Sequence, residues 1–343
     1  MSVDKEELPN PRRRVGDQQQ KNVFADESSP IHILLVEDSI ADATLLRRSI
    51  RDSSWSARAE VDECTTLAKA AEMVAAREYD VVMLDMGLPD GRGISNIETL
   101  LEIRRDLTIV VLTGNDDASA ALDALNLGAQ EYAIKGMYEG EALVRIMRHA
   151  IERNRMAVEL RELREREWFL ATHDNLTKLP NRQLFNDRVE QALATAKRQK
   201  GQFAICFLDL DGFKPVNDEF GHAVGDELLT RVATVLQEVV RDTDTVARIG
   251  GDEFVLLLTP LSNWEQATNV SNRVIEQLTT IRDVNDHEVN IGASIGISIF
   301  PDHGANLDQL MRNSDMAMYC SKRAGRGKVS MYDDSMRTQP KTP

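Results

Sequence analysis

Short apolar runs alternate with amphipathic segments from Ile31 onward, and this alternation constrains the fold more than any other feature of the sequence. The apolar runs predict five strands, at residues 31–36, 59–63, 80–85, 108–113 and 131–134. The segments between them favour helices, as at residues 42–51 and 117–127. Strands that alternate with helices form a parallel sheet covered on both faces. We therefore expect a doubly wound α/β domain, with ligands at the carboxyl ends of its strands.

Polar side chains stand at the ends of four of these strands: Glu37 and Asp38, Asp85, Thr113 and Lys135. The carboxyl ends of parallel strands meet at one edge of a sheet, so these side chains should gather there. Three carboxylates suit Mg²⁺, a hydroxyl can hold a phosphoryl oxygen, and an ammonium can neutralise another. The pattern predicts phosphoryl transfer to a carboxylate nucleophile.

This arrangement closely resembles the receiver domain of two-component response regulators, over about residues 31–150. The resemblance implies that Asp85 is the phosphoacceptor. It also implies that Mg²⁺ is held by Glu37, Asp38, Asp85 and the backbone carbonyl of Gly87. Glu37 stands where many receivers have Asp, a change that keeps the charge.

The same resemblance implies that Thr113 and Tyr132 form a switch pair and that Lys135 binds the phosphoryl group. A cognate histidine kinase would then be a partner of this protein. An inert receiver, which docks but is never phosphorylated, is the alternative.

Residues 140–170 predict a single helix, because no Pro or Gly follows Gly140. A loose heptad seam favours a paired, coiled-coil stalk over a solvated single helix; it comprises Leu143, Ile146, Ala150, Ala157 and Leu160. A second domain is expected after it, because 343 residues exceed one typical domain.

The second half of the chain predicts a mixed α/β domain. A capped turn at residues 172–182 enters a new helix. Further strands are predicted near residues 203–209, 245–249, 254–258 and 289–300, and helices at 225–240, 264–281 and 306–324. No internal repeat is evident.

Two acidic clusters stand at strand ends in this half. Gly250-Gly251 lies between two apolar runs and predicts a tight hairpin turn, and Asp252 and Glu253 follow it. Asp209-Leu210-Asp211 ends the apolar run that begins at Phe203. Carboxylates at the ends of two strands make a plausible Mg²⁺ site, because Mg²⁺ prefers oxygen ligands together with substrate phosphates.

The residues after the first acidic cluster suit a nucleotide. Gly212 permits a close backbone approach, so the amides near Phe213 and Lys214 can meet phosphates. Asn217 can both donate to and accept from a base edge. The carboxylate of Asp226 can accept two hydrogen bonds from guanine, whereas adenine lacks that paired donor edge. Asp226 therefore argues for GTP over ATP.

The residues 250–254, GGDEF, resemble the signature of diguanylate cyclases, which join two GTP into cyclic di-GMP, and the resemblance extends over residues 172–333. It implies Mg²⁺ ligands at Asp209, Asp252 and the Leu210 carbonyl, with up to two ions per catalytic site. Asp252 would also accept the proton of the 3′-hydroxyl, and Glu253 would be a further catalytic acid. Asn217 and Asp226 would bind guanine.

The resemblance also covers phosphate-binding residues and a feedback site. Lys322 and Arg326 would hold the terminal phosphates, and Gly327 departs from the Asn that often follows that arginine. Arg241 and Asp244 match the family's RxxD motif for inhibition by product, five residues ahead of the GGDEF signature.

Composition limits the partners and the location. The net charge of −15 argues against a nucleic-acid-binding surface over the whole chain, so no DNA partner is expected. No apolar run approaches the ~20 residues that span a bilayer, and the N-terminus lacks an apolar signal core. Three widely separated cysteines are typical of a reducing compartment. We expect a cytoplasmic protein without membrane insertion.

Together these features predict a response regulator whose output is cyclic di-GMP synthesis by a homodimer, activated by phosphorylation and inhibited by cyclic di-GMP. The expected divisions are a disordered tail (1–29), a receiver (30–139), a helical linker (140–171), a GGDEF domain (172–333) and a tail (334–343), with no phosphodiesterase domain following. A catalytically silent adaptor that binds cyclic di-GMP or GTP is the alternative, and a cyclase that accepts ATP is a second one.

Overall fold

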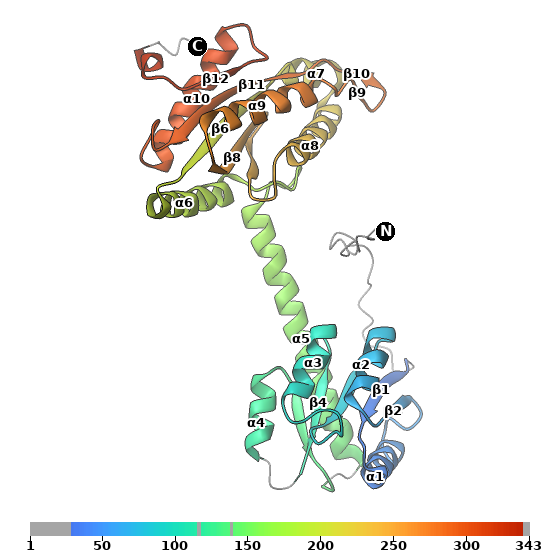
Figure 1. Ribbon diagram of the computed structural model, residues 1–343. Helices are drawn as coiled ribbons and strands as arrows, with labels where there is room; N and C mark the ends of the chain where they lie inside the picture. The colour runs from blue at the N-terminus through green and yellow to red at the C-terminus, as the bar shows by residue number, and fades with distance from the viewer. Residues whose placement is uncertain (1–28, 115–117, 138–139, 339–343) are drawn as a thin grey trace, which may run out of the picture. The chain divides into compact units, whose positions relative to one another are not determined.

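The computed structural model describes residues 29–114, 118–137 and 140–338 (Figure 1). The chain divides into two compact units between Leu163 and Arg164. The predicted tail at 1–29 falls almost entirely outside the described residues, as does the end of the predicted tail at 334–343.

The first unit contains a five-stranded parallel sheet in the order β2-β1-β3-β4-β5. Its strands are β1 (Ile31–Val36), β2 (Ala59–Cys64), β3 (Val81–Asp85), β4 (Ile109–Thr113) and β5 (Glu131–Ile134). The central strands β3 and β4 are buried throughout, as expected of strands covered on both faces. The predicted doubly wound parallel sheet is confirmed.

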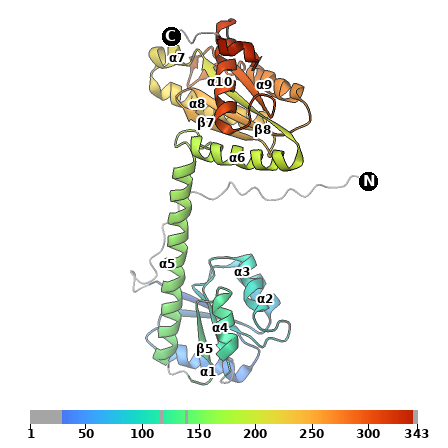
Figure 2. The same ribbon diagram turned by 90° about the vertical axis from the view of Figure 1, so that its left-hand side faces the viewer.

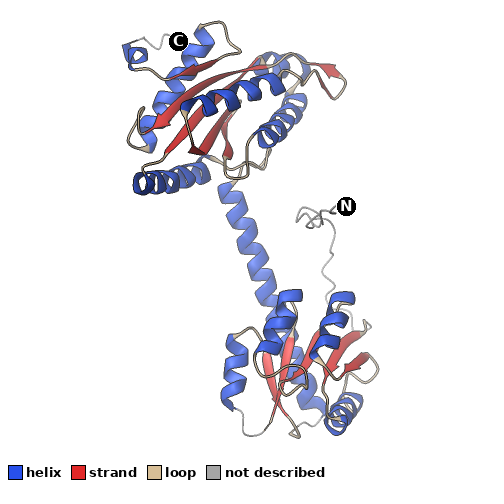
Figure 3. Cartoon of the chain, in the orientation of Figure 1, coloured by secondary structure: helices blue, strands red, loops and turns tan. Residues whose placement is uncertain are grey.

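Helices cover both faces of this sheet (Figure 3). One face packs against α1 (Ile40–Arg51) and the start of α5 (Gly140–Thr172), through a core that includes Leu46, Leu143 and Met147. The other face packs against α2 (Leu67–Ala76), α3 (Ser95–Ile103) and α4 (Ala118–Asn126). The alternating side chains of each strand therefore supply two separate cores.

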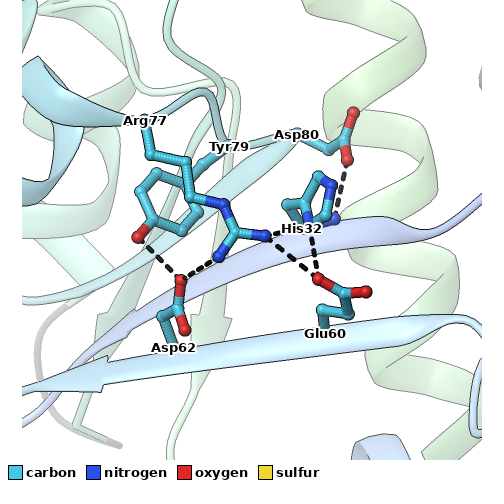
Figure 4. Close-up of polar contacts among 6 residues, drawn as sticks. All are labelled: His32, Glu60, Asp62, Arg77, Tyr79 and Asp80. Carbon is cyan, nitrogen blue, oxygen red and sulfur yellow. Dashed lines mark hydrogen bonds and ion pairs between the residues drawn. The ribbon is translucent and has the colours of Figure 1, made fainter.

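A polar cluster centred on Arg77 fastens the edge strand β2 (Figure 4). The Arg77 guanidinium lies 2.8 Å from Asp62 Oδ2 and 3.0 Å from Glu60 Oε2, both on β2. It also lies 2.8 Å from His32 Nδ1 on β1. Tyr79 donates its hydroxyl hydrogen to Asp62, and burial together with that carboxylate raises the pKa of Tyr79 to about 12. The cluster joins the first two strands to the segment that enters β3.

Helix α5 is one continuous helix, as predicted, but the expected heptad seam is wrong in its first half. Leu143 and Ala150 are buried in the core of the first unit and cannot meet a partner helix. The exposed apolar side chains of α5 are further along, at Met156, Leu160, Leu163, Trp168, Phe169 and Leu170.

The second unit contains a five-stranded sheet in the order β12-β11-β6-β8-β7. Its strands are β6 (Gln202–Asp211), β7 (Thr245–Gly250), β8 (Glu253–Leu261), β11 (Gly292–Phe300) and β12 (Val329–Met331). Strands β11 and β12 are parallel and the other pairs are antiparallel, so the predicted mixed α/β fold is confirmed. A small ribbon of β9 (Asp283–Val284) and β10 (His287–Glu288) stands apart from the sheet.

Helices also cover both faces of the second sheet (Figure 2). One core includes residues of α7 (Phe213–Phe220), α8 (His222–Val239) and α9 (Trp264–Leu278). The other includes residues of α6 (Arg182–Gln199) and α10 (Leu307–Arg323). Asn181, Asn263 and Asn306 cap α6, α9 and α10, each accepting a hydrogen bond from the amide three residues on.

Three elements depart from the sequence-based prediction. The helix α7 and the ribbon β9–β10 were not predicted, and a single 3-10 turn covers Asp334–Thr338 where a tail was expected. In the part of the chain that the structure describes, no helix combines the length and the apolar character that crossing a bilayer requires.

Candidate functional site

The acidic residues predicted in the first unit gather at the carboxyl edge of its sheet. Glu37 and Asp38 follow β1 and Asp85 ends β3, and one ligand oxygen from each lies within 4.8 Å of the others. Glu37 and Asp85 are buried, whereas Asp38 is exposed. A donor set made only of carboxylate oxygens fits Mg²⁺. A Cβ atom at Gly87 would lie 3.6 Å from Asp85 Oδ2, so Gly87 borders this acidic group, and its carbonyl as a metal ligand stays a prediction.

Lys135, just after β5, completes this edge. Its Nζ lies 2.7 Å from Glu37 Oε2 and 3.0 Å from Asp85 Oδ2. Asp42 of α1, which the sequence reasoning did not single out, is 3.6 Å from the same ammonium. Burial lowers the pKa of Lys135, but its hydrogen bonds to Glu37 and Asp85 outweigh this and leave the pKa raised. Burial also raises the pKa of Glu37, against the hydrogen bond from Lys135.

The predicted switch residues occupy neighbouring strands. Thr113 is buried at the end of β4, and the Tyr132 side chain on β5 is 37% exposed. The register pairs Thr113 with Ile134 and Val111 with Tyr132, so Thr113 and Tyr132 are diagonal neighbours on one face. The role of Thr113 and Tyr132 as a switch pair stays a prediction.

In the second unit, strand pairing brings the predicted catalytic acids together. Asp209 of β6 lies opposite Glu253 of β8 in the antiparallel register. The amide of Leu210 donates to the carbonyl of Asp252 at 3.2 Å, which places the hairpin turn beside the metal-ligand candidates. Burial raises the pKa of Asp209 and of Glu253, and neighbouring carboxylates add to this effect.

A lysine partly neutralises this acidic edge. Lys322, in the last turn of α10, lies 2.6 Å from Asp209 Oδ1 and lowers the pKa of that carboxyl against the effect of burial. Among the residues that the structure describes, Asp209, Asp252 and Glu253 do not approach one another as closely as the group in the first unit. Their carboxylate chemistry still fits Mg²⁺, with substrate phosphates supplying the remaining oxygens.

Arg248, which lies on β7 just before the hairpin turn, holds that turn through its guanidinium. Its Nε and Nη2 donate to the Gly251 carbonyl at 3.0 and 2.8 Å, and Nη1 donates to Asp174 Oδ1 at 2.9 Å. Asp174 also accepts hydrogen bonds from the amide and hydroxyl of Thr177. The start of the second unit is therefore tied to the turn that carries Asp252. The sequence reasoning missed both Arg248 and Asp174.

The predicted nucleotide-binding residues lie around α7. Gly212 precedes the helix at φ 88°, and a Cβ there would meet the Asn290 carbonyl at 2.8 Å, so the glycine is required. The amides of Phe213 and Lys214 form the first turn of α7, where backbone N–H groups lack helical partners.

Asn217 and Asp226 come from successive helices. Asn217 packs against Gly225, where any Cβ would collide with its amide oxygen. That oxygen is buried and has no hydrogen-bond partner among the described residues, as expected of a group that awaits a ligand. Asp226 follows Gly225 near the start of α8 and is exposed.

The predicted feedback residues line a cavity of about 530 Å³ together with Arg273 of α9. Asp244 accepts hydrogen bonds from the amides of Arg241 and Thr259, which fixes its carboxylate. Arg273 donates to the Val239 carbonyl. No sequence signal marks Arg273, because an arginine on the polar face of a surface helix is common.

Comparisons with known proteins identify two families in the chain. Residues 33–148 match the response regulator receiver domain, and residues 171–328 match the diguanylate cyclase GGDEF domain. The bifunctional diguanylate cyclase/cyclic di-GMP phosphodiesterase MucR of Pseudomonas aeruginosa is 47% identical over 167 residues, which cover 49% of this chain and 24% of MucR.

Diguanylate cyclase TpbB of the same organism is 40% identical over 158 residues, which cover 46% of this chain and 36% of TpbB. A solved structure of the TpbB GGDEF domain has 38% identity and a TM-score of 0.47, with coverage of 48% of this chain and 96% of that chain. The chain spans only 24% and 36% of the length of these two curated relatives. The two matched regions show that the chain contains a response regulator receiver domain followed by a diguanylate cyclase GGDEF domain.

Proposed function

We propose that the protein is a diguanylate cyclase that condenses two GTP into cyclic di-GMP and two pyrophosphates, under control of its receiver. The observation that carries this proposal is the meeting of Asp209, Leu210 and Asp252 at one sheet edge, beside Lys322. Metal ligands, a proton acceptor and a phosphate-binding cation are thereby available at one place. The curated relative TpbB, named a diguanylate cyclase, supports the same activity.

In the proposed reaction, the 3′-oxygen of one GTP attacks the α-phosphorus of the other. The new 3′-oxygen–phosphorus bond forms as the bond from the α-phosphorus to pyrophosphate breaks. Asp252 accepts the proton of the 3′-hydroxyl, and Glu253 adds negative charge beside it. Asp209, Asp252 and the Leu210 carbonyl would hold Mg²⁺, and the bound ion would draw negative charge from the α-phosphate. Lys322 and Arg326 hold the terminal phosphates, and the amides at the start of α7 contact the same group.

Guanine recognition is assigned to Asn217 and Asp226. The amide oxygen of Asn217 supports this assignment, because a buried acceptor without a partner costs free energy until it accepts a hydrogen bond. The exposed carboxylate of Asp226 can accept from the ring N–H and the amine of guanine. Adenine lacks this pair of adjacent donors.

Two GTP molecules must face each other, so we propose a homodimer. The exposed residues Met156, Leu160, Leu163 and Leu170 of α5 recur at the spacing of a heptad seam. A kinase-derived phosphoryl group on Asp85 would recruit Lys135 and Thr113 and alter the β4–β5 face, and α5 packs directly on this unit's sheet.

We further propose that the protein works in the cytoplasm, where GTP is available.

Feedback by cyclic di-GMP is assigned to the cavity that Arg241, Asp244 and Arg273 line. Two guanidinium groups in one cavity suit the phosphates of a dinucleotide, because arginine binds phosphate oxygens in a bidentate manner. If cyclic di-GMP bound in this cavity and the GGDEF domain did not turn over GTP, the protein would be a catalytically silent adaptor. A turnover assay with GTP decides between an active cyclase and such an adaptor.

Removing one metal-ligand charge should abolish the reaction. We expect Asp252→Asn and Asp209→Asn each to lower the rate of cyclic di-GMP formation at least about 100-fold, since metal contacts supply several kcal/mol and each 1.36 kcal/mol is tenfold in rate. Asp286→Asn, in the β9–β10 turn, is the control and should keep the parent rate. Circular dichroism would verify folding. A parent-like rate for Asp252→Asn would refute the assigned metal and proton roles.

Replacing the guanine-reading acid should weaken base selection. We expect Asp226→Ser to reduce the preference for GTP over ATP by about 10- to 100-fold, the range for a lost hydrogen bond to a charged group. Competition between the two nucleotides for binding is the measurement. Glu238→Ser, an exposed acid in the last turn of the same helix, is the control. An unchanged preference in Asp226→Ser would show that guanine is read elsewhere.

A phosphoryl mimic on the receiver should activate the enzyme most at low protein concentration. We expect beryllofluoride to raise the specific activity about tenfold there, if the active dimer is a minor state of 10% or less at rest. Asp85→Asn should lose this response, and Asp123→Asn on the exposed face of α4 should keep it. Equal activation of Asp85→Asn and the parent would rule out the assigned phosphoacceptor.

Loss of an arginine from the cavity should relieve product inhibition. We expect Arg241→Ala to raise the inhibition constant of cyclic di-GMP about tenfold or more, because charge-assisted hydrogen bonds to phosphate are lost. Arg282→Ala, an exposed arginine before the β9–β10 ribbon, serves as the control. Identical inhibition curves for Arg241→Ala and the parent would remove the feedback assignment.

A further inference from the structure

Asp211 is a nearly buried carboxylate whose hydrogen bonds come from Ser294 and Gly327 and not from the metal-ligand candidates. It lies two residues after Asp209 on β6, on the same face of the sheet, and its side chain is 11% exposed. Its Oδ2 accepts from the Ser294 hydroxyl at 2.8 Å and from the Gly327 amide at 3.1 Å. Its Oδ1 is buried, accepts no hydrogen bond among the described residues, and lies 3.7 Å from Arg326 Nε.

The Gly327 amide belongs to an unusual turn after α10. Three successive residues, Gly325, Arg326 and Gly327, have positive φ values of 108°, 58° and 61°. Arg326 is not a glycine, so its left-handed backbone costs free energy that the surroundings must offset. The turn is tied to the sheet by the bond from Gly327 to Asp211, which joins positions 116 residues apart in the chain.

The two acids of β6 therefore face two cations from the end of α10, but in different ways. Asp209 makes a direct ion pair with Lys322 at 2.6 Å. A bound metal would compete with Lys322 for Asp209, and substrate phosphates would compete with Asp209 for Lys322. Asp211 uses its Oδ2 on two neutral donors and approaches Arg326 only at 3.7 Å. This geometry leaves the Arg326 guanidinium largely exposed and able to turn toward an anion.

We infer that Asp211 is a positioning residue: it fastens the turn at residues 325–327 through Gly327 and so presents Arg326 to the terminal phosphates of GTP. This inference rests on the proposed function, because it takes the cyclase substrate as the anion. The contact from position 327 to Asp211 uses the backbone amide, so Gly327 can make it without a side chain. Asp211 contributes to substrate affinity, and it contributes little to the chemical step.

The first test compares two substitutions in the full-length protein. Asp211→Ala removes the acceptor, and we expect the Kd of Mg²⁺·pyrophosphate and of Mg²⁺·GTP to rise about tenfold, as for one lost hydrogen bond to a charged group. Asp211→Asn keeps an acceptor oxygen and should bind within about twofold of the parent. If Asp211→Asn loses binding as severely as Asp209→Asn does, Asp211 is a metal ligand and the inference is overturned.

A double-mutant cycle tests whether Asp211 acts through Arg326. In the Arg326→Ala background, Asp211→Ala should raise the Kd by no more than about twofold, because the residue that it positions is already gone. Fully additive effects would overturn the inference. Asp302→Ala is the control: this exposed acid accepts a hydrogen bond from Gln202 in the same unit, and its loss should leave the Kd unchanged.

Amide hydrogen exchange in the nucleotide-free protein provides a readout that is independent of activity. Exchange at residues 325–328 should speed up in Asp211→Ala and stay parent-like in Asp211→Asn. Ser294→Ala leaves Asp211 with one hydrogen bond, so it should also raise the Kd and speed up exchange at residues 325–328. This variant keeps the test available if Asp211→Ala is unstable. Unchanged exchange in Ser294→Ala and Asp211→Ala would overturn the inference. A parent that binds GTP without forming cyclic di-GMP would refute the proposed function and leave this inference standing.

Discussion

The contact of Arg248 with Asp174 and the Gly251 carbonyl is the interaction on which the catalytic geometry of the second unit depends. The Arg248 side chain is 11% exposed, and its guanidinium donates three N–H groups to these two partners. Two glycines with positive φ make a turn that has little rigidity of its own. Because Arg248 holds the carbonyl of that turn, Asp252 is kept just before β8 and beside Leu210. The same contact links the turn to the segment that follows α5, so a change in that segment can reach the metal-ligand candidates.

Both units place carboxylates at strand ends and balance them with one lysine. Lys135 serves Glu37 and Asp85, and Lys322 serves Asp209. Burial raises the pKa values of Glu37 and Asp209, and repulsion from neighbouring carboxylates adds to this effect. The lysine offsets part of this repulsion. We propose that arriving Mg²⁺ and phosphate take over this role in each unit and release the lysine to the phosphate oxygens.

The strand–helix alternation predicted the sheets well, because hydrophobic periodicity reports which residues are buried. The bounds predicted for β1 and β5 agree with the structure. Periodicity shows which face of a helix is apolar but not what that face packs against. Leu143 and Ala150 fit the spacing of a seam between two helices, but they pack on the sheet of their own unit. Helix α7 was missed because it has only eight residues and contains Pro215. The site acids stand at predicted strand ends, and the two family resemblances implied their roles. The roles of Asp211, Arg248 and Arg273 depend on contacts between distant segments, which the sequence pattern does not encode.

We propose above all that Asp209, the Leu210 carbonyl and Asp252 hold the metal on GTP. The most direct measurement is a crystal structure of the full-length protein with Mn²⁺ and a GTP analogue that cannot react, with the metal located by its anomalous scattering. We predict Mn²⁺ on these three groups, Lys322 moved from Asp209 to the phosphates, and guanine against Asn217 and Asp226. Metal bound to other acids of the second unit, or a base outside the contact range of Asn217 and Asp226, would contradict the account.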